Sequence, residues 1–296
     1  RRQRQMCIRD RDIGLHSTEP GRRQGIFHDN FNGTSNKLLD KEIGLRVNND
    51  LYESFHFGER IIRDLEYVLT YKVLKKMRDT SALMTVSKIH RKEYLLGVKA
   101  HGGKPEEIQN RVYCMYHGVD TDFLRPLNIN KGDNFVVGMI GRCSTVKGFD
   151  IIPELTGVLA REAPEIKLHI ATITGLKNSL DNELYRRMKE TESKFPENIK
   201  VEDTAYGEEG KLKLLNSWHA LLAPSKYEPQ GQIDLEAMAC GIVPIVGLGG
   251  LREKVVDGFN GVWIDPFNPR KIAEKIIEVY RSARGGSYYN GNNCEA

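Results

Sequence analysis

The chain has 296 residues and a formal net charge of +4, with 40% of its residues apolar and 28% charged. This composition is that of a globular protein with one large core or two ordinary ones, and so mild a charge argues against a nucleic-acid-binding protein. We find no apolar run long enough to cross a membrane and no signal peptide, so we expect a cytoplasmic protein with neither nucleic-acid nor membrane partners. The five cysteines are scattered, without the spacing of a metal site or a disulfide framework.

The two ends of the chain differ in composition from the rest. Residues 1–10 are basic and aperiodic and look like the in-frame translation of a transposase-type sequencing-library adapter. On that interpretation residues 1–12 are a non-native tail and the chain is an amino-terminally truncated fragment, whereas the alternative is an ordinary basic tail. Residues 285–296 are rich in glycine and asparagine, and we expect a disordered tail there.

A first region of secondary structure is expected from residue 13 to residue 123. His16 stands just after what looks like the end of a strand. A linker follows at 124–134, where Pro126 and several Asn and Gly residues interrupt the apolar pattern. Within the first region the spacing of apolar residues predicts a helix over 59–76, a strand over 82–86, a helix from 87 to about 98 and a strand over 112–117.

From Phe135 the chain alternates strands and helices regularly. Repeated strand–helix units of this length predict a parallel, doubly wound α/β sheet over residues 135–284. The strands are expected at 135–140, 166–171, 199–201, 219–223, 242–246 and 261–264, and the helices at 149–162, 181–195, 208–218, 232–240 and 269–283.

The loop after the first of these strands carries two cations in the run Gly141-Arg142-Cys-Ser-Thr-Val-Lys147-Gly148. A strand-to-helix loop presents backbone N–H groups and the positive end of a helix dipole to an anion. Arg142 can hold phosphate oxygens through two hydrogen bonds at once, and Lys147 adds a compact positive charge. We therefore expect a phosphate site here, and the alternative is a pair of surface cations.

A later loop and helix carry two glutamates. Glu228 follows the strand that ends at residue 223, and Glu236 is expected about two turns into the next helix, with Asp234 in its first turn, where the helix dipole favours an anion. In open α/β sheets, ligands bind at the carboxyl ends of the strands. Because a carboxylate accepts hydrogen bonds from neighbouring hydroxyls, one acid suits the sugar and the other the ribose of a sugar nucleotide. The alternative is a solvated loop acid and an exposed helix residue.

The run Glu-Pro-x-Gly-x-x-x-Leu-Glu-Ala-Met-Ala-x-Gly from Glu228 to Gly241, followed by a Gly-Gly turn, resembles the signature of retaining GT-B glycosyltransferases. The resemblance covers essentially residues 13–283. It implies an α/β GT-B architecture of two Rossmann-like doubly wound domains, the first of them incomplete. It also implies a reaction that needs no cofactor, with ADP-glucose or UDP-glucose as the donor. The site residues that it implies are Arg142, Lys147, Glu228 and His16 for catalysis, and Glu236, Tyr227, Gly231, Gly249, Gly250 and Leu251 for binding of the nucleotide sugar.

Asp120-x-Asp122 has the spacing with which the other large glycosyltransferase fold holds a divalent ion. The run that begins at His117 instead resembles the turn that closes the first domain of GT-B enzymes, where the acids cap and turn the chain. We therefore expect no metal site.

Within that family, the run His16-Ser-Thr-Glu-x-Gly-Arg, the helix that follows Val86-Ser87 and the Lys147-Gly148 pair look most like glycogen and starch synthases. This likeness implies transfer of a glucosyl unit to an α-1,4-glucan. Two alternatives stay open. One is another retaining transferase of the sucrose, trehalose or mannosyl type, with a small-molecule or lipid-linked acceptor. The other is an inactive fragment that only binds nucleotide sugar.

Overall fold

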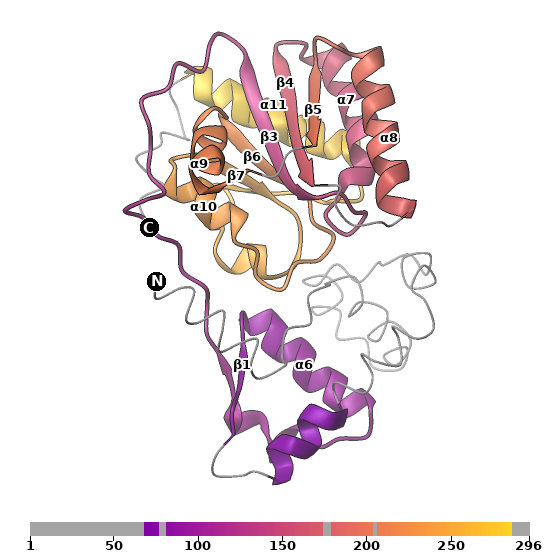
Figure 1. Ribbon diagram of the computed structural model, residues 1–296, viewed down its shortest axis with the longest axis vertical. Helices are drawn as coiled ribbons and strands as arrows, with labels where there is room; N and C mark the ends of the chain where they lie inside the picture. Colours follow the sequence, from indigo (N-terminus) through magenta and orange to yellow (C-terminus); the bar gives the residue numbers. More distant parts are fainter. Residues whose placement is uncertain (1–67, 77–80, 174–178, 204–205, 286–296) are drawn as a thin grey trace. The chain divides into compact units, whose positions relative to one another are not determined.

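The computed structural model describes residues 68–76, 81–173, 179–203 and 206–285 (Figure 1). The chain divides into two compact units, Arg1–Gly118 and Val119–Ala296. Both contain parallel β-strands connected by α-helices, which confirms the predicted α/β class. The adapter-like tail, His16 and residues 286–296 lie outside the described residues, so the expectations placed on them stay predictions.

The described part of the first unit is built around a pair of parallel strands. β1 (Leu83–Thr85) pairs with β2 (Val112–Cys114), and α6 (Lys88–Ala100) lies between them in the sequence. Ser87 caps α6, because its hydroxyl accepts a hydrogen bond from the His90 N–H at 2.9 Å. These elements confirm the predicted strands and the helix that begins after Ser87.

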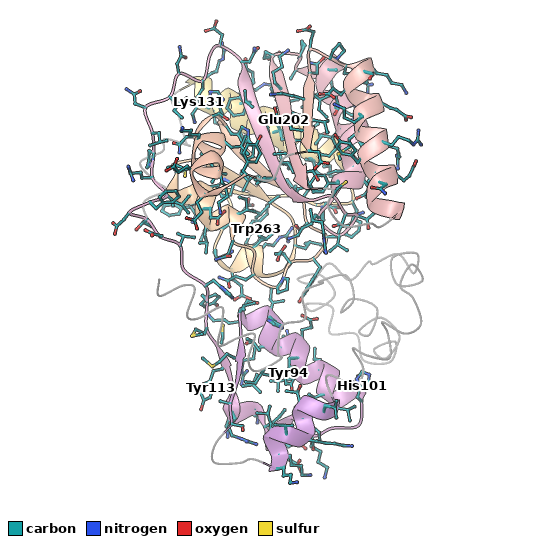
Figure 2. All side chains as sticks on the ribbon, viewed as in Figure 1. Tyr94, His101, Tyr113, Lys131, Glu202 and Trp263 are labelled. Atoms are coloured by element: carbon teal, nitrogen blue, oxygen red, sulfur yellow. The ribbon has the colours of Figure 1, made fainter. Side chains whose placement is uncertain are left out.

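The rest of the described first unit packs around these elements. A helix spans 68–76, which confirms the described part of the helix predicted over 59–76. Two 3-10 turns, Pro105–Glu107 and Gln109–Arg111, lead from α6 to β2. The small core, in which Tyr94 is labelled in Figure 2, consists of Leu74, Leu83, Tyr94, Val98, Ile108 and Val112.

The second unit contains a parallel sheet in the order β5-β4-β3-β6-β7-β8 (Figure 1). The strand that comes first in the sequence lies inside the sheet and later strands are added on both sides of it, as in a doubly wound fold. The strands are β3 (Phe135–Arg142), β4 (Ile166–Ile173), β5 (Ile199–Asp203), β6 (Ala220–Ala223), β7 (Val243–Val246) and β8 (Val262–Trp263).

Helices cover both faces of this sheet, and β3 shows the reason in its sequence. Val137 and Met139 point into the core shared with α7, α8 and α11, whereas Val136 and Ile140 pack against the core shared with α9 and α10. The helices are α7 (Ile152–Glu162), α8 (Ser179–Lys194), α9 (Glu208–Asn216), α10 (Ile233–Ala239) and α11 (Pro269–Gly285), with 3-10 helices at Phe149–Ile151 and Gly249–Glu253.

Gly138 stands in the middle of β3 because Trp218 lies directly over it. A Cβ at position 138 would lie 1.8 Å from a ring carbon of Trp218, so no side chain fits there. Trp218 is fully buried. Its indole therefore fills the space that a β3 side chain would take, and it closes the core on the α9 side of the sheet.

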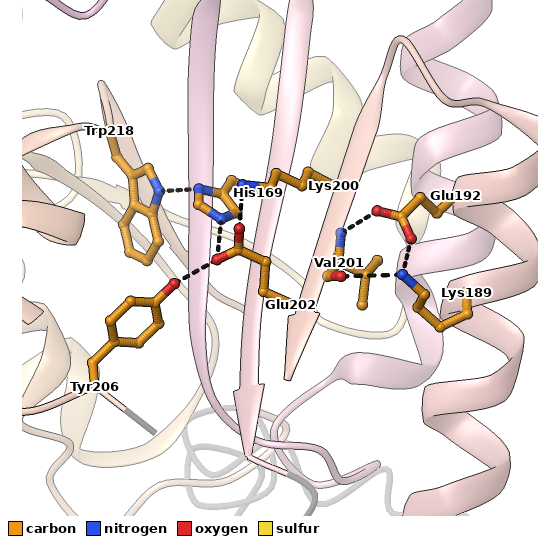
Figure 3. Close-up of polar contacts among 8 residues, drawn as sticks. All are labelled: His169, Lys189, Glu192, Lys200, Val201, Glu202, Tyr206 and Trp218. Atoms are coloured by element: carbon orange, nitrogen blue, oxygen red, sulfur yellow. Dashed lines mark hydrogen bonds and ion pairs between the residues drawn. The ribbon is translucent and has the colours of Figure 1, made fainter. Parts of the chain in front are cut away.

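A polar network extends from the same indole toward the edge of the sheet (Figure 3). The Trp218 Nε1–H donates to His169 Nδ1 at 3.1 Å, and His169 Nε2 lies 3.2 Å from the carboxylate of Glu202. Glu202 also pairs with Lys200 and accepts a hydrogen bond from the Tyr206 hydroxyl. Burial alone would raise the pKa of Glu202, but these hydrogen bonds outweigh burial and lower it to about 2.

Candidate functional site

Three loops follow neighbouring strands of the second unit. β3, β6 and β7 lie side by side in the sheet, and the loops after them span 143–148, 224–232 and 247–248. Because the carboxyl ends of parallel strands meet at the same edge of a sheet, these loops converge there. The described residues of the predicted site lie in these loops, in the residues at their ends, in the 3-10 helix Gly249–Glu253 or, for Glu236, in the first turn of α10.

Backbone hydrogen bonds hold the three loops together. The Lys226 N–H donates to the Val146 carbonyl at 2.8 Å, which joins the β6 loop to the β3 loop. The Gly250 N–H donates to the Glu228 carbonyl at 2.7 Å, which joins the segment after β7 to the β6 loop. The N–H of Gly250, one of the residues expected to bind the nucleotide sugar, is therefore engaged within the protein.

Gly249 and Gly250 let two backbones approach more closely than side chains would allow. A Cβ at Gly249 would lie 2.3 Å from the Glu228 carbonyl oxygen, and one at Gly250 would lie 2.1 Å from that of Pro229. Gly249 also has a φ of 89°, in the left-handed region that favours glycine. The Gly-Gly pair thus fixes the path of the loop that carries Glu228.

Lys147 and Glu228 form an ion pair between the β3 loop and the β6 loop. The Glu228 side chain is 13% exposed and that of Lys147 is 32% exposed. The alternative in which Glu228 is a solvated loop acid is therefore wrong for this structure. A cation suited to phosphate and a carboxylate suited to hydroxyls lie in direct contact.

Glu236 pairs with Lys211 of α9 at 2.6 Å. Its expected place about two turns into a helix is wrong, since α10 begins at Ile233 and Glu236 lies in the first turn. Gln232, with a φ of −125°, is the N-cap, so α10 begins one residue after the expected start. From either start Glu236 lies only about one turn of 3.6 residues into the helix, so the expectation counted one turn too many. At 13% side-chain exposure, Glu236 is not the exposed helix residue of the alternative interpretation either.

Asp234 and Lys254 form a buried ion pair that the sequence did not predict. The Asp234 side chain is 0% exposed and its carboxylate lies 2.7 Å from the Lys254 ammonium. Burial raises the pKa of Asp234 and lowers the pKa of Lys254, and their mutual attraction opposes both shifts. Asp234 lies in the first turn of α10, as predicted. Its carboxylate also contacts a cation 20 residues away, which no local sequence signal reveals.

The other described residues of the predicted site differ in exposure. Arg142 is half-buried and is the last residue of β3. Tyr227 and Leu251 are each 1% exposed. The Leu251 side chain packs over Gly231, where a Cβ would lie 2.5 Å from it. Tyr227, Gly231 and Leu251 thus form the body of the loop region, with Lys147 and Glu228 nearer its surface.

Asp120 turns the chain at the start of the second unit. Its carboxylate accepts hydrogen bonds from the N–H groups of Asp122 and Phe123, each at 3.1 Å, as expected for a capping acid. In the part of the chain that the structure describes, no cluster of three or more His, Cys, Asp or Glu residues is arranged to hold a metal ion. None of the helices described there is long and apolar enough to span a membrane.

The chain was compared with known proteins. The family model described as "Glycosyl transferases group 1" matches residues 120–287. The mannosylfructose-phosphate synthase of Agrobacterium fabrum is 27% identical over 151 residues, which are 50% of this chain and 33% of that protein. A glycogen synthase of Kosmotoga olearia is 30% identical over 159 residues, which are 50% of this chain and 31% of that protein.

The fold has relatives among solved structures. Anabaena Alr3699/HepE in complex with UDP superposes with a TM-score of 0.64 at 19% identity, over 78% of this chain and 62% of that one. A likeness at this identity shows the fold, and it supports an assignment to GT-B glycosyltransferase architecture. The chain spans about a third of the two relatives named above and less than two thirds of this structural neighbour.

Proposed function

Because the chain belongs to the group 1 glycosyl transferases, we propose that it is a retaining glycosyltransferase of the glycogen-synthase kind. It takes a glucosyl unit from ADP-glucose or UDP-glucose and adds it to the nonreducing end of an α-1,4-glucan. One observation carries this proposal: Lys147 and Glu228 are paired where the loops after β3 and β6 meet. A diphosphate-sugar donor offers a partner to each of them.

The donor occupies the carboxyl-end loops of the second unit in this proposal. Its diphosphate lies against the β3 loop, where Arg142 and Lys147 supply positive charge. Its hexose lies at Glu228, and its ribose hydroxyls lie at Glu236 in the first turn of α10. The structural neighbour from Anabaena has been solved with UDP and with UDP-glucose, which supports a nucleoside-diphosphate sugar as the donor class.

The chemistry follows from the charges that develop as the donor bond breaks. Negative charge grows on the β-phosphate oxygen of the departing nucleoside diphosphate, and in this proposal the positive charges of Arg142 and Lys147 stabilise it. As the phosphate attracts the Lys147 ammonium, the Glu228 carboxylate becomes available to the hydroxyls of a sugar with oxocarbenium character. As the bond from the anomeric carbon to the diphosphate breaks, the acceptor hydroxyl attacks from the same face and passes its proton to the departing β-phosphate oxygen. Attack from that face retains the anomeric configuration.

The acceptor is the second part of the proposal. The 30% identity with a glycogen synthase supports a glucan acceptor. The 27% identity with a mannosylfructose-phosphate synthase supports a second candidate, transfer to a small phosphorylated sugar. The proposed donor site is the same in both cases. The two candidates therefore differ in the acceptor, and so in the product that forms.

A transfer assay with labelled donors distinguishes the two candidates. The chain is incubated with UDP-[14C]glucose or ADP-[14C]glucose, in the presence of glycogen or of fructose 6-phosphate. We expect label in alcohol-precipitable glycogen, released by an α-1,4-specific amylase, and none with the Lys147→Met variant. Label in a soluble phosphorylated disaccharide would instead establish the second candidate. Absence of transfer to both acceptors would contradict the proposed activity.

A further inference from the structure

Lys254 contacts the loop that carries Glu228 through its ammonium group. The ammonium donates to the backbone oxygen of Gln230 at 2.7 Å and to that of Gly231 at 2.9 Å. These two residues follow Glu228 closely in the same loop. The third partner of the ammonium is the Asp234 carboxylate at 2.7 Å, so the lysine is held between the loop and the first turn of α10.

Stability alone does not explain a buried ion pair at this place. Removing two charges from water costs free energy that their attraction only partly returns, and a well-packed apolar pair is often as stable or more stable. The two loop carbonyls do explain the lysine, because an apolar side chain would leave them without this donor. Asp234, fully buried beside it, compensates the charge and fixes the ammonium in position.

The segment before Lys254 holds the same loop. The 3-10 helix Gly249–Glu253 ends at the residue before it, and Gly249 and Gly250 approach the backbone of residues 228–230 too closely for any side chain. The segment 249–254 therefore contacts the loop 228–231 at both of its ends. Gly249 and Gly250 pack against the loop backbone, and Lys254 donates hydrogen bonds to it.

We propose that Lys254, fixed by Asp234, is a positioning residue that sets the backbone of residues 228–231 and thereby directs the Glu228 carboxylate at the hexosyl group of the donor. This inference rests on the proposed function, in which Glu228 binds the donor sugar. Its consequence is specific: the Asp234–Lys254 pair affects recognition of the hexose more than recognition of the nucleotide, whose ribose is assigned to Glu236.

An ion pair that only stabilises the fold would behave differently. Exchanging both partners for apolar residues, as in Asp234→Val/Lys254→Met, removes the charge imbalance together with the pair. If the pair is purely structural, this double variant binds ligands as the wild type does once it is folded. If Lys254 is a positioning residue, the double variant folds and still loses hexose recognition, because the bonds to Gln230 and Gly231 are gone.

The chain offers a matched control in the pair Lys189–Glu192, which also bonds to backbone. Glu192 accepts the Val201 N–H at 2.8 Å and Lys189 donates to the Val201 carbonyl at 3.4 Å (Figure 3). Val201 lies on β5, at the sheet edge away from β6 and β7. The variant Lys189→Met/Glu192→Val therefore removes a more exposed lysine–carboxylate pair that also bonds to backbone, without touching the Glu228 loop.

The test is calorimetric binding of UDP-glucose, UDP, ADP-glucose and ADP to the whole chain, with thermal melting of each variant. We expect the Asp234→Val/Lys254→Met variant to melt cooperatively. Its affinity for the nucleoside diphosphate that the wild type binds, UDP or ADP, should stay within about twofold of the wild-type affinity. Its affinity for the corresponding nucleoside diphosphate glucose, UDP-glucose or ADP-glucose, should fall about tenfold or more. The control double variant should bind both the nucleoside diphosphate and its glucose conjugate as the wild type does. A folded double variant with wild-type affinity for both ligands would overturn the inference.

Two further variants keep the inference testable if the double variant does not fold. Lys254→Arg can still donate to the loop carbonyls, whereas Lys254→Met cannot. The quantity to compare is the ratio of the affinity for the nucleoside diphosphate glucose to the affinity for the nucleoside diphosphate. We expect this ratio to be nearly that of the wild type in Lys254→Arg and to fall in Lys254→Met. Equal ratios in the two variants would overturn the inference. If the wild-type chain bound none of the four ligands, the proposed function itself would fail.

Discussion

Lys147 and Glu228, which stand 81 residues apart in the sequence, form an ion pair between the loops that follow two adjacent parallel strands. Neither residue has a partner of this kind within its own loop. The pair exists because β3 and β6 are neighbours in the sheet, so that the carboxyl ends of both strands open at one edge. We expect the diphosphate and the hexose of the donor to be joined at this place.

The first prediction concerns Glu228. In Glu228→Gln the side chain keeps its size but loses the charge that accepts sugar hydroxyls most strongly. We expect transferase activity to fall about a hundredfold or more, with affinity for the free nucleoside diphosphate nearly unchanged. The free energy of unfolding should change by less than about 1 kcal/mol, because the partner Lys147 stays partly in water.

Steady-state assays with the labelled donor, together with calorimetry of UDP and ADP, check this prediction. A Glu228→Gln variant that is fully active would remove Glu228 from the site. A variant that loses activity and diphosphate affinity in parallel would place Glu228 at the nucleotide rather than at the sugar.

The second prediction concerns Glu236. Glu236→Ala removes the acceptor that we assign to the ribose hydroxyls, so affinity for the nucleoside diphosphate should weaken by about 1–3 kcal/mol. The matched control is Glu278→Ala, which removes another carboxylate from a lysine pair, on α11. The binding free energies that calorimetry gives for the two variants should differ by that amount. Equal binding free energies would exclude Glu236 from nucleotide binding.

The third prediction concerns the close approach at Gly250. In Gly250→Ala the new methyl group would lie 2.1 Å from the Pro229 carbonyl oxygen and 2.7 Å from the Gln230 Cα, both of them backbone atoms. The loop must move to accept it, and we expect a loss of about 2–4 kcal/mol in the free energy of unfolding, together with weaker donor binding. Urea unfolding measures the first effect and calorimetry the second.

Gly207→Ala is the control for that substitution, because a Cβ there meets nothing within 4 Å and the residue has a φ of −66°. Gly207 is the N-cap of α9, where Ala is less favourable than Gly, but Ala also lowers the entropy of the unfolded chain, so the free energy of unfolding should change by less than about 1 kcal/mol. If Gly250→Ala were as stable as Gly207→Ala, the backbone contact would not constrain the loop.

The fourth prediction concerns pH and His219. Its Nδ1 accepts the Val136 N–H at 3.0 Å, and burial, helped by the charge of Lys131, lowers the pKa of His219 to about 4. In the unfolded chain the pKa of a histidine is about 6.5, so between these values the unfolded state binds more protons. The free energy of unfolding must therefore fall as the pH drops from about 6.5 toward 4.

Urea unfolding at pH 7.5 and pH 5 checks the sign. The wild type should lose more stability between these pH values than His219→Asn does, by on the order of 1 kcal/mol after allowance for partial exposure of the ring. A variant with the same pH dependence as the wild type would show that His219 does not contribute. Burial also lowers the pKa of His169, which acts in the same direction in both proteins.

Much of the fold of the second unit could be predicted from the sequence because its signals are local. The apolar run of β3 and the turn at Gly241 each lie within a few residues of the feature that they specify. The edge at which Glu228, Lys147 and the Gly-Gly turn meet also followed, since parallel strands fix where their loops emerge.

What the sequence did not predict depends on contacts between distant residues. Lys254 follows β7 in the sequence and contacts Asp234 and two loop carbonyls that precede β7. Asp and Lys are usually exposed, so the sequence does not predict that these two form a buried pair. The expected position of Glu236, two turns into α10, is wrong although the start of the helix was predicted to within one residue, because four residues make only about one turn. His16 lies outside the described residues, and its assignment stays a prediction.

The most direct test of the central claim is a crystal structure of the chain grown with UDP-glucose or ADP-glucose. We expect density for the diphosphate beside Arg142 and Lys147, with a hexose hydroxyl within about 3.2 Å of the Glu228 carboxylate and a ribose hydroxyl equally near Glu236. A nucleotide bound elsewhere on the chain, or a donor whose hexose points away from Glu228, would contradict it.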